Sequence, residues 1–206
     1  GNSGSAPSLV PEIVSELNQY IDSYGTWYWK YKTDDQYGSL IGDGAYIYGF
    51  KPTNVLEANY IEELTIPVTV PYDGENFVVK GIVHDYIDVK DVYFSNGEIG
   101  GDRLILEIGT LNVNCLNLRG FNDKCVNLVI SGDMPVSPSD VEDSLLHDTS
   151  ITGIGLFYQL YLSESIKTIT MSEATWIPAY AFLGCSNLVE VNAPKVQFIY
   201  RGAFQH

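Results

Sequence analysis

Apolar residues near the start of the chain follow a helical spacing. Ile13, Leu17 and Ile21 recur at every fourth position, so a helix would carry all three on one face. Gly25 follows this segment and is a typical stop signal after a helix. The spacing therefore predicts a helix over residues 11–22.

The next segments have the pattern of β-strands. Residues 26–50 are rich in Trp, Tyr and Phe, and turn-forming residues interrupt them, which predicts two or three short strands. Residues 64–82 contain Asp73-Gly74 between two runs of β-branched residues, and this arrangement predicts a hairpin.

Beyond residue 60, apolar residues recur at positions i, i+3 and i+5. These triplets are Ile61/Leu64/Ile66, Val89/Val92/Phe94, Val113/Leu116/Leu118, Cys125/Leu128/Ile130, Ile166/Ile169/Met171 and Leu188/Val191/Ala193. The last two lie in stretches that superimpose without a gap when Trp176-Ile177 is placed on Phe198-Ile199. The shift corresponds to a period of about 22 residues, which is typical of leucine-rich solenoids, whose stacked rungs share one core.

The earlier triplets are unevenly spaced. The triplet that begins at Val113 starts too close to Cys125 to form a separate rung. We interpret it as the back side of the rung whose front carries Cys125. The long interval between Leu128 and Ile169 then predicts one degenerate rung and a surface insertion within residues 135–160.

The final stretch resembles the BspA-type leucine-rich repeat proteins of Bacteroides-like bacteria, whose repeat runs AFxxCxxLxxVxLPxxVxxIGxxAF. The matching residues are Phe182, Cys185, Leu188, Val191, Pro194, Val196, Ile199, Ala203 and Phe204. Ala193 departs from the Ile or Leu that the family prefers. The resemblance is specific over residues 160–204, looser over 60–134 and absent before residue 60. It implies a secreted or outer-surface protein, often a lipoprotein anchored through a removed N-terminal segment, that acts in adhesion and protein binding without catalysis.

The expected fold is therefore mainly β with some α: a leucine-rich-repeat solenoid with an N-terminal helix and a small antiparallel β cap. Residues 1–8 are small and polar and are interpreted as a linker. We expect the helix and the β capping region within residues 9–80, and the solenoid over residues 81–206. Because the last rung has no cap, we expect the array to continue beyond His206 or to pair end to end.

Charge and cysteine content narrow the function. The chain has 26 acidic and 11 basic residues, and its net charge of −15 opposes binding to nucleic acid or anionic lipid. No apolar run reaches the ~18 residues that would cross a bilayer. Cys115, Cys125 and Cys185 lack metal-binding spacing, so we expect three buried, reduced thiols. A disulfide between Cys115 and Cys125 is the alternative.

Candidate catalytic groups are scattered. His84, His147 and His206 lie in different segments and have no partner at motif spacing. Acidic clusters occur at residues 34–35, 73–75 and 140–143. They lack the calcium-loop pattern and are interpreted as solvated turns. The sequence thus predicts no enzyme, cofactor or metal site; a hydrolase with two carboxylates in a cleft is a rival hypothesis.

Two surfaces are candidates for binding. Residues at i+2 and i+4 of a triplet should point away from the core, and they are Glu63, Thr65, Asp91, Tyr93, Thr168, Thr170, Glu190 and Asn192. Stacked rungs would align the acidic members into a stripe suited to a basic protein partner. Alternatively, Trp27, Trp29 and Tyr31 share one face of a strand and would form a platform for glycan rings. The same three aromatics would otherwise form the core of a cap over the first rung.

Overall fold

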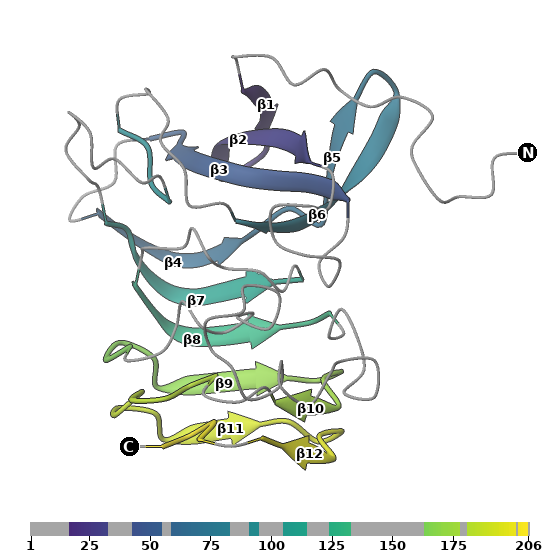
Figure 1. The fold of residues 1–206 in the computed structure, drawn as a ribbon. Helices are drawn as coiled ribbons and strands as arrows, with labels where there is room; N and C mark the ends of the chain where they lie inside the picture. Colours follow the sequence, from purple (N-terminus) through teal and green to yellow (C-terminus); the bar gives the residue numbers. More distant parts are fainter. Residues whose placement is uncertain are drawn as a thin grey trace, which may run out of the picture.

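The computed structural model describes residues 17–32, 43–54, 59–82, 91–94, 105–114, 124–132, 163–177, 181–200 and 202–205. Within these ranges the chain forms twelve strands and no helix. The strands belong to two five-stranded sheets and one short parallel pair, β10 (Trp176–Ile177) with β12 (Phe198–Ile199). Figure 1 shows the two large sheets one above the other.

The N-terminal sheet is mixed. Its strands are β1 (Asn18–Ile21), β2 (Gly25–Lys32), β3 (Gly44–Pro52), β5 (Thr69–Tyr72) and β6 (Glu75–Ile82), in the order β1-β2-β3-β6-β5. Only β3 and β6 pair in parallel. The predicted hairpin is confirmed as β5 and β6, and its turn residues Asp73 and Gly74 both have positive φ, 47° and 80°, as a type I′ turn requires. Strands β2 and β3 likewise confirm the prediction for residues 26–50.

The expected helix over residues 11–22 is wrong wherever the structure describes it. Residues 18–21 form β1, which pairs antiparallel with β2, with Ile21 opposite Thr26. Ile21 is 70% exposed, whereas its neighbour Tyr20 packs against the core. Hydrogen bonding to the exposed edge of β2 outweighs the local helical spacing. Residues 1–16, including the expected linker, lie outside the described residues.

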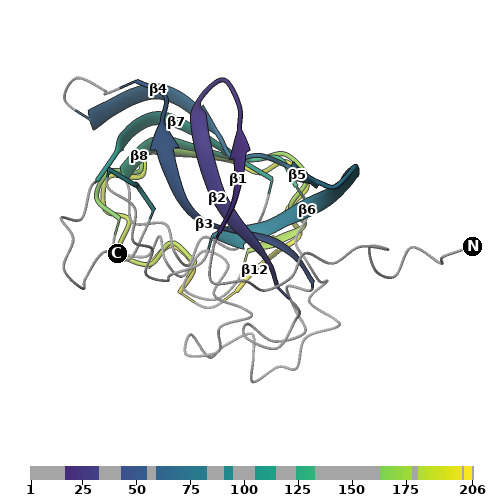
Figure 2. The same ribbon diagram turned by 90° about the horizontal axis from the view of Figure 1, so that it is seen from above.

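The second sheet, here called the ladder, is parallel throughout. Its strands are β4 (Tyr60–Thr65), β7 (Glu107–Val113), β8 (Lys124–Ile130), β9 (Thr168–Met171) and β11 (Glu190–Asn192), in the order β4-β7-β8-β9-β11. Their middle inward residues stack in one column: Leu64, Leu111, Leu128, Ile169 and Val191. Viewed from above, β4, β7 and β8 lie as nested, slightly offset arcs on the same side of the molecule, as expected for successive strands of one stack (Figure 2).

The fold is not the leucine-rich-repeat solenoid that we expected. Ile108 pairs with Cys125, a short step along the chain, whereas Leu128 pairs with Ile169, a much longer one. The predicted period joins only β9 to β11 and β10 to β12, where the register confirms the internal repeat. The ladder is therefore an irregular parallel β stack that becomes periodic only at its end.

The triplet assigned to Val113 is also wrong. Val113 is the third inward residue of β7, after Ile108 and Leu111, so it belongs to the front sheet and not to the back of the next rung. Leu116 and Leu118 lie outside the described residues, as do residues 133–162, where we expected a degenerate rung.

One apolar core joins the two large sheets. Its buried members run from Trp27 in β2 through the ladder to Ala203. The rings of Trp27 and Phe50 are centred 4.4 Å apart, and Phe94 stacks on both. The N-terminal sheet lies over the β4 end of the ladder (Figure 1). Because β4 of the ladder comes before β5 and β6 of the N-terminal sheet in the chain, a boundary near residue 80 does not separate the two sheets.

The two described cysteines confirm part of the thiol prediction. Cys125 and Cys185 are buried thiols, whereas Cys115 lies outside the described residues. Burial raises the pKa of the Cys185 thiol, because the thiolate loses solvation. Cys185 is therefore poorly suited to act as a nucleophile.

Candidate functional site

The outward side chains of the ladder align in two columns. The first contains Glu63, Thr110, Asn127, Thr168 and Glu190, and the second contains Thr65, Asn112, Val129, Thr170 and Asn192. Neighbouring strands of a sheet are ~4.8 Å apart, so the members of a column are in side-chain contact range. We call these ten residues the polar face.

Hydrogen bonds connect the middle of the first column. The Thr168 hydroxyl donates to Asn127 Oδ1 at 2.6 Å. The Asn127 amide donates in turn to Thr110 Oγ1 at 3.4 Å and to the Gly109 carbonyl oxygen at 3.3 Å. One chain of bonds thus links three strands and orients the Asn127 amide.

The second column is tied to the N-terminal sheet. Asn112 Nδ2 donates to Glu63 Oε1 at 2.9 Å and to Thr65 Oγ1 at 3.3 Å. The hydroxyl of Tyr24, between β1 and β2, donates to the same Thr65 oxygen at 3.4 Å. These bonds restrict the side-chain rotamers at the β4 end of the face.

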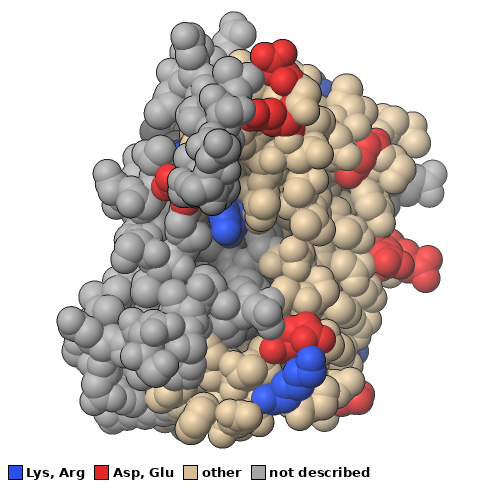
Figure 3. All heavy atoms as spheres, turned by 90° about the vertical axis from the view of Figure 1, so that its right-hand side faces the viewer, with Lys and Arg blue, Asp and Glu red and all other residues tan. Residues whose placement is uncertain are grey.

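The expected acidic stripe is wrong. Glu63 and Glu190 lie on the outermost strands, and Thr110, Asn127 and Thr168 separate them. Asp91 is an exposed turn residue with a φ of 63° and does not lie on the ladder. In the side view of Figure 3, acidic side chains form separate groups on the described surface. The prediction failed because it assumed a rung at residues 89–94.

Tyr93 is a core residue and not a surface group. It is 5% exposed, and its backbone N–H and carbonyl pair with those of Phe50 at 2.7 and 3.0 Å. Its hydroxyl donates to Asn59 Oδ1 at 3.0 Å. These hydrogen bonds of Tyr93 hold residues 91–94 against β3.

Four members of the polar face were missed from the sequence: Thr110, Asn112, Asn127 and Val129. A signal for them exists, because Ile108, Leu111 and Val113 have the same i, i+3, i+5 spacing as the recognised triplets. The outward residues of that triplet and of the one at Cys125 supply all four. Six predicted residues do lie on the face: Glu63, Thr65, Thr168, Thr170, Glu190 and Asn192.

The glycan platform predicted at Trp27, Trp29 and Tyr31 is wrong, because all three side chains are buried. The Tyr31 and Phe77 rings meet edge to face at 5.3 Å, and Trp29 also packs against Phe77. Burial raises the pKa of Tyr31, and the negative charge of Asp43 raises it further. The alternative, that these aromatics form the core of a cap, is confirmed.

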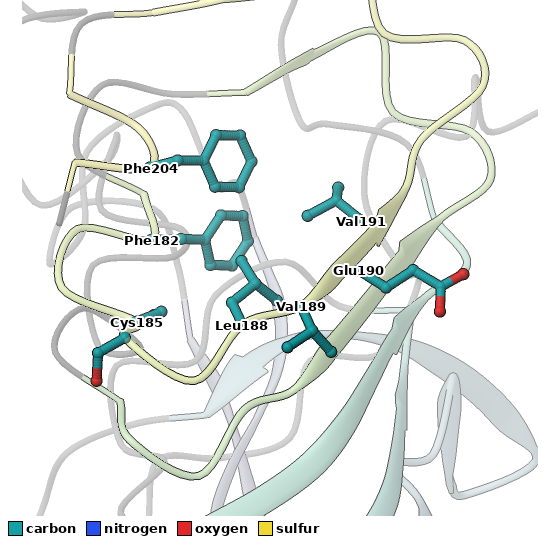
Figure 4. A pocket seen from close by; sticks show the side chains of 8 residues that line it. Phe182, Cys185, Leu188, Val189, Glu190, Val191 and Phe204 are labelled. Carbon is teal, nitrogen blue, oxygen red and sulfur yellow. The ribbon is translucent and has the colours of Figure 1, made fainter.

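A second candidate surface lies at the opposite end of the ladder. We call it the end face and define it by Leu188, Val191, Phe198, Ile199 and Phe204 of the last rung. It contains a hollow of about 320 Å³, lined by Phe182, Cys185, Ser186, Leu188, Val189, Glu190, Val191 and Phe204. Figure 4 shows Phe182, Phe204, Leu188 and Val191 pointing into the hollow, whereas Glu190 points away. Apolar side chains therefore face the hollow, and Ser186 and Glu190 add polar atoms to its lining.

Most of the histidines and acidic clusters considered as candidate catalytic or metal-binding groups lie outside the described residues. Asp73 lies in the hairpin turn and Glu75 begins β6, whereas the remaining acidic clusters and the three histidines lie outside the described residues. Among the described residues, no group of three or more His, Cys, Asp or Glu side chains is placed to hold a metal ion. The same residues include no helix long and apolar enough to cross a membrane.

Comparisons with known proteins leave the family open. No protein-family model matches the chain, and no curated protein matches it. Among solved structures, it is similar to the crystal structure of pneumococcal vaccine antigen PcpA, with 12% sequence identity and a TM-score of 0.34. The match covers 92% of this chain and 42% of that chain, so the chain spans less than half of PcpA's length. Similarity at this level supports no argument about fold or function.

Proposed function

We propose that this protein is a non-enzymatic recognition protein that binds another protein through the polar face. The observation that supports this most directly is the alignment of ten outward side chains across five strands. Hydrogen bonds already hold Asn112, Asn127 and Thr168 in place. Binding through such a face costs little side-chain entropy, because those rotamers are fixed beforehand.

The chemistry of the face favours a partner that makes neutral hydrogen bonds. Its centre carries hydroxyl and amide groups, which both donate and accept, and its two carboxylates lie on the edge strands. A polypeptide surface with exposed backbone and polar side chains fits this pattern. Because charge is peripheral, the association should depend only weakly on salt.

We also propose a location outside the cell, either secreted or on the outer surface with a lipid anchor. The resemblance of residues 181–204 to the BspA-type repeat supports this location and a host or bacterial surface protein as the partner.

A crosslinking experiment followed by affinity measurements tests the proposed function. A photo-crosslinking residue at Thr168 should capture a partner from extracellular-matrix or mucosal extracts, and one at the exposed Thr69 of β5 should not. Thr110→Lys combined with Thr170→Lys should then weaken binding of that partner about tenfold or more, because two ammonium groups cover the face.

The matched control places two lysines at Thr69 and Asn76, which are exposed on the N-terminal sheet. Binding in this control should stay within about twofold of wild type. Equal affinities of the face variant and the control would reject the polar face as the binding site.

A further inference from the structure

The last rung exposes positions that the preceding rung buries. Trp176 and Ile177 are 2% and 1% exposed, whereas Phe198 and Ile199, their partners in register, are 54% and 61% exposed. Val191 is 38% exposed, although every other residue of its column is fully buried. The end face therefore has the composition of an interior surface and lacks a covering layer in the described structure.

The backbone at this end is also placed to accept another strand. β11 and β12 are each an outermost strand of their sheet. The N–H groups of Val189 and Glu190 both donate to the Lys167 carbonyl oxygen, at 2.9 and 3.3 Å. The backbone N–H and C=O groups of successive residues in a strand point to opposite sides. Since Glu190 faces β9, Asn192 also faces β9, and the N–H and C=O of Val191 face the open edge.

We propose that the end face binds the end face of a second copy of this chain. In the resulting twofold dimer, β11 pairs antiparallel with its own copy about Val191. The N–H of each Val191 donates to the carbonyl oxygen of the other, as in a hydrogen-bonded antiparallel pair. This inference goes beyond the proposed function, because it concerns a different surface.

The side chains of β11 are complementary to themselves only in this register. A twofold axis at Val191 places each Glu190 opposite the Asn192 of the other copy, so that an amide meets a carboxylate. The same chemistry joins Asn112 to Glu63 at 2.9 Å within the ladder. An axis at Glu190 would bring two carboxylates together, and an axis at Asn192 would place Glu190 opposite Pro194, which has no N–H.

The same contact covers the apolar part of the last rung. β11 and β12 belong to different sheets, but both lie at the bottom of the stack in Figure 1, so the contact should also remove Phe198 and Ile199 from solvent. Burial of these side chains supplies the favourable free energy. The net charge of −15 on each copy opposes association, so added salt should strengthen the dimer.

Sedimentation velocity over a range of protein concentrations tests the dimer. Wild type should dimerise, and more tightly at high salt than at low salt. Val191→Lys should weaken dimerisation about tenfold or more, because two ammonium groups would face each other at the axis. Thr69→Lys, at an exposed site of β5 in the N-terminal sheet, should leave it unchanged.

Crosslinking tests the register and does not depend on how well the lysine variant folds. In the proposed pair the two Val191 Cα atoms are about 5.5 Å apart. Val191→Cys should therefore give a covalent dimer with a short bismaleimide, whereas Thr69→Cys, on the N-terminal sheet, should not. A wild-type monomer at every concentration and salt, an unaffected Val191→Lys dimer, or equal crosslinking of the two cysteine variants would each overturn the proposal. Loss of the dimer with intact partner binding would leave the proposed function standing.

Discussion

The two ends of the ladder differ in how they are covered. At the β4 end, the N-terminal sheet buries Trp27, Trp29 and Phe50 completely. At the β11 end, Phe198 and Ile199 are more than half exposed, although Trp176 and Ile177 are buried at the same positions of the preceding rung. The comparison shows that exposure in a stacked fold depends on position in the stack as well as on residue type.

A core substitution at the covered end should cause the largest loss of stability. Trp27→Ala removes a fully buried side chain that contacts Phe50 and Phe94, so we expect a loss of about 3–5 kcal/mol in the free energy of unfolding. Urea unfolding measures it. Ile21→Ala, at a 70% exposed position in the same sheet, should change stability by only about 0.5 kcal/mol. Equal effects would contradict the assignment of Trp27 to the core.

A matched pair of aromatics tests the open end directly. Trp176→Ala should cost about 3–5 kcal/mol, because Trp176 is buried between rungs and meets Tyr200 edge to face at 5.8 Å. Phe198→Ala, its register partner, should cost less than about 1 kcal/mol at concentrations where the protein is monomeric. If Phe198→Ala were as damaging as Trp176→Ala, the end face would be covered within a single chain.

Alkaline pH should lower the free energy of unfolding, because two buried tyrosines at the covered end resist ionisation in the folded state. Burial raises the pKa of Tyr28 and of Tyr31 above the ordinary value of 10.0. The folded state then keeps these protons at a pH where the unfolded chain releases them. The resulting stability is fully present below pH 10 and is lost as the pH rises through the folded-state pKa values.

Tyr31→Phe keeps the ring and removes the ionisable group. We expect the free energy of unfolding of this variant to fall less steeply above pH 10 than that of wild type, as measured by urea unfolding at stepped pH. The exposed Tyr60→Phe is the control and should follow wild type. Identical pH curves for Tyr31→Phe and wild type would show that Tyr31 ionises as easily in the folded state as in the unfolded state.

The smallest effect is expected for the ion pair between the last two rungs. Lys195 Nζ lies 2.6 Å from Glu173 Oε2, but both side chains are about half exposed, at 57% and 44%. Lys195→Ala should therefore cost less than about 1 kcal/mol, and high salt should abolish the difference from wild type. A larger cost that persists in salt would mean that the aliphatic part of Lys195 contributes to packing.

Local signals in the sequence predicted the parts of the fold that depend on nearby residues. The Asp73-Gly74 hairpin and the repeat that joins the last two rungs are confirmed, since both follow from short-range pattern. The pairing of β4 with β7 was not predicted, because their register is set by core packing across a long separation. Val113 illustrates the difficulty: it completes a triplet with Ile108 and Leu111 and begins another with Leu116.

The sequence also predicted only the part of the candidate site that follows from local spacing. Triplet spacing placed Thr168, Thr170 and Glu190 on the outer side of the sheet, as the structure has them. It could not show that residues 91–94 lie outside the ladder, because their position depends on distant contacts: the backbone bridge between Tyr93 and Phe50 and the packing of Phe94 on Trp27.

The route of the chain between its two large sheets has a mechanical consequence. β3 belongs to the N-terminal sheet, β4 to the ladder, and β5 and β6 to the N-terminal sheet again. Two strands of the upper sheet are therefore added only after the chain has contributed a strand to the lower one. Hinge motion between domains normally needs a single flexible link with few contacts across it. Here the repeated crossing and the shared core should make the two sheets tumble as one rigid body. The N-terminal sheet therefore cannot be grafted onto another protein as an independent unit.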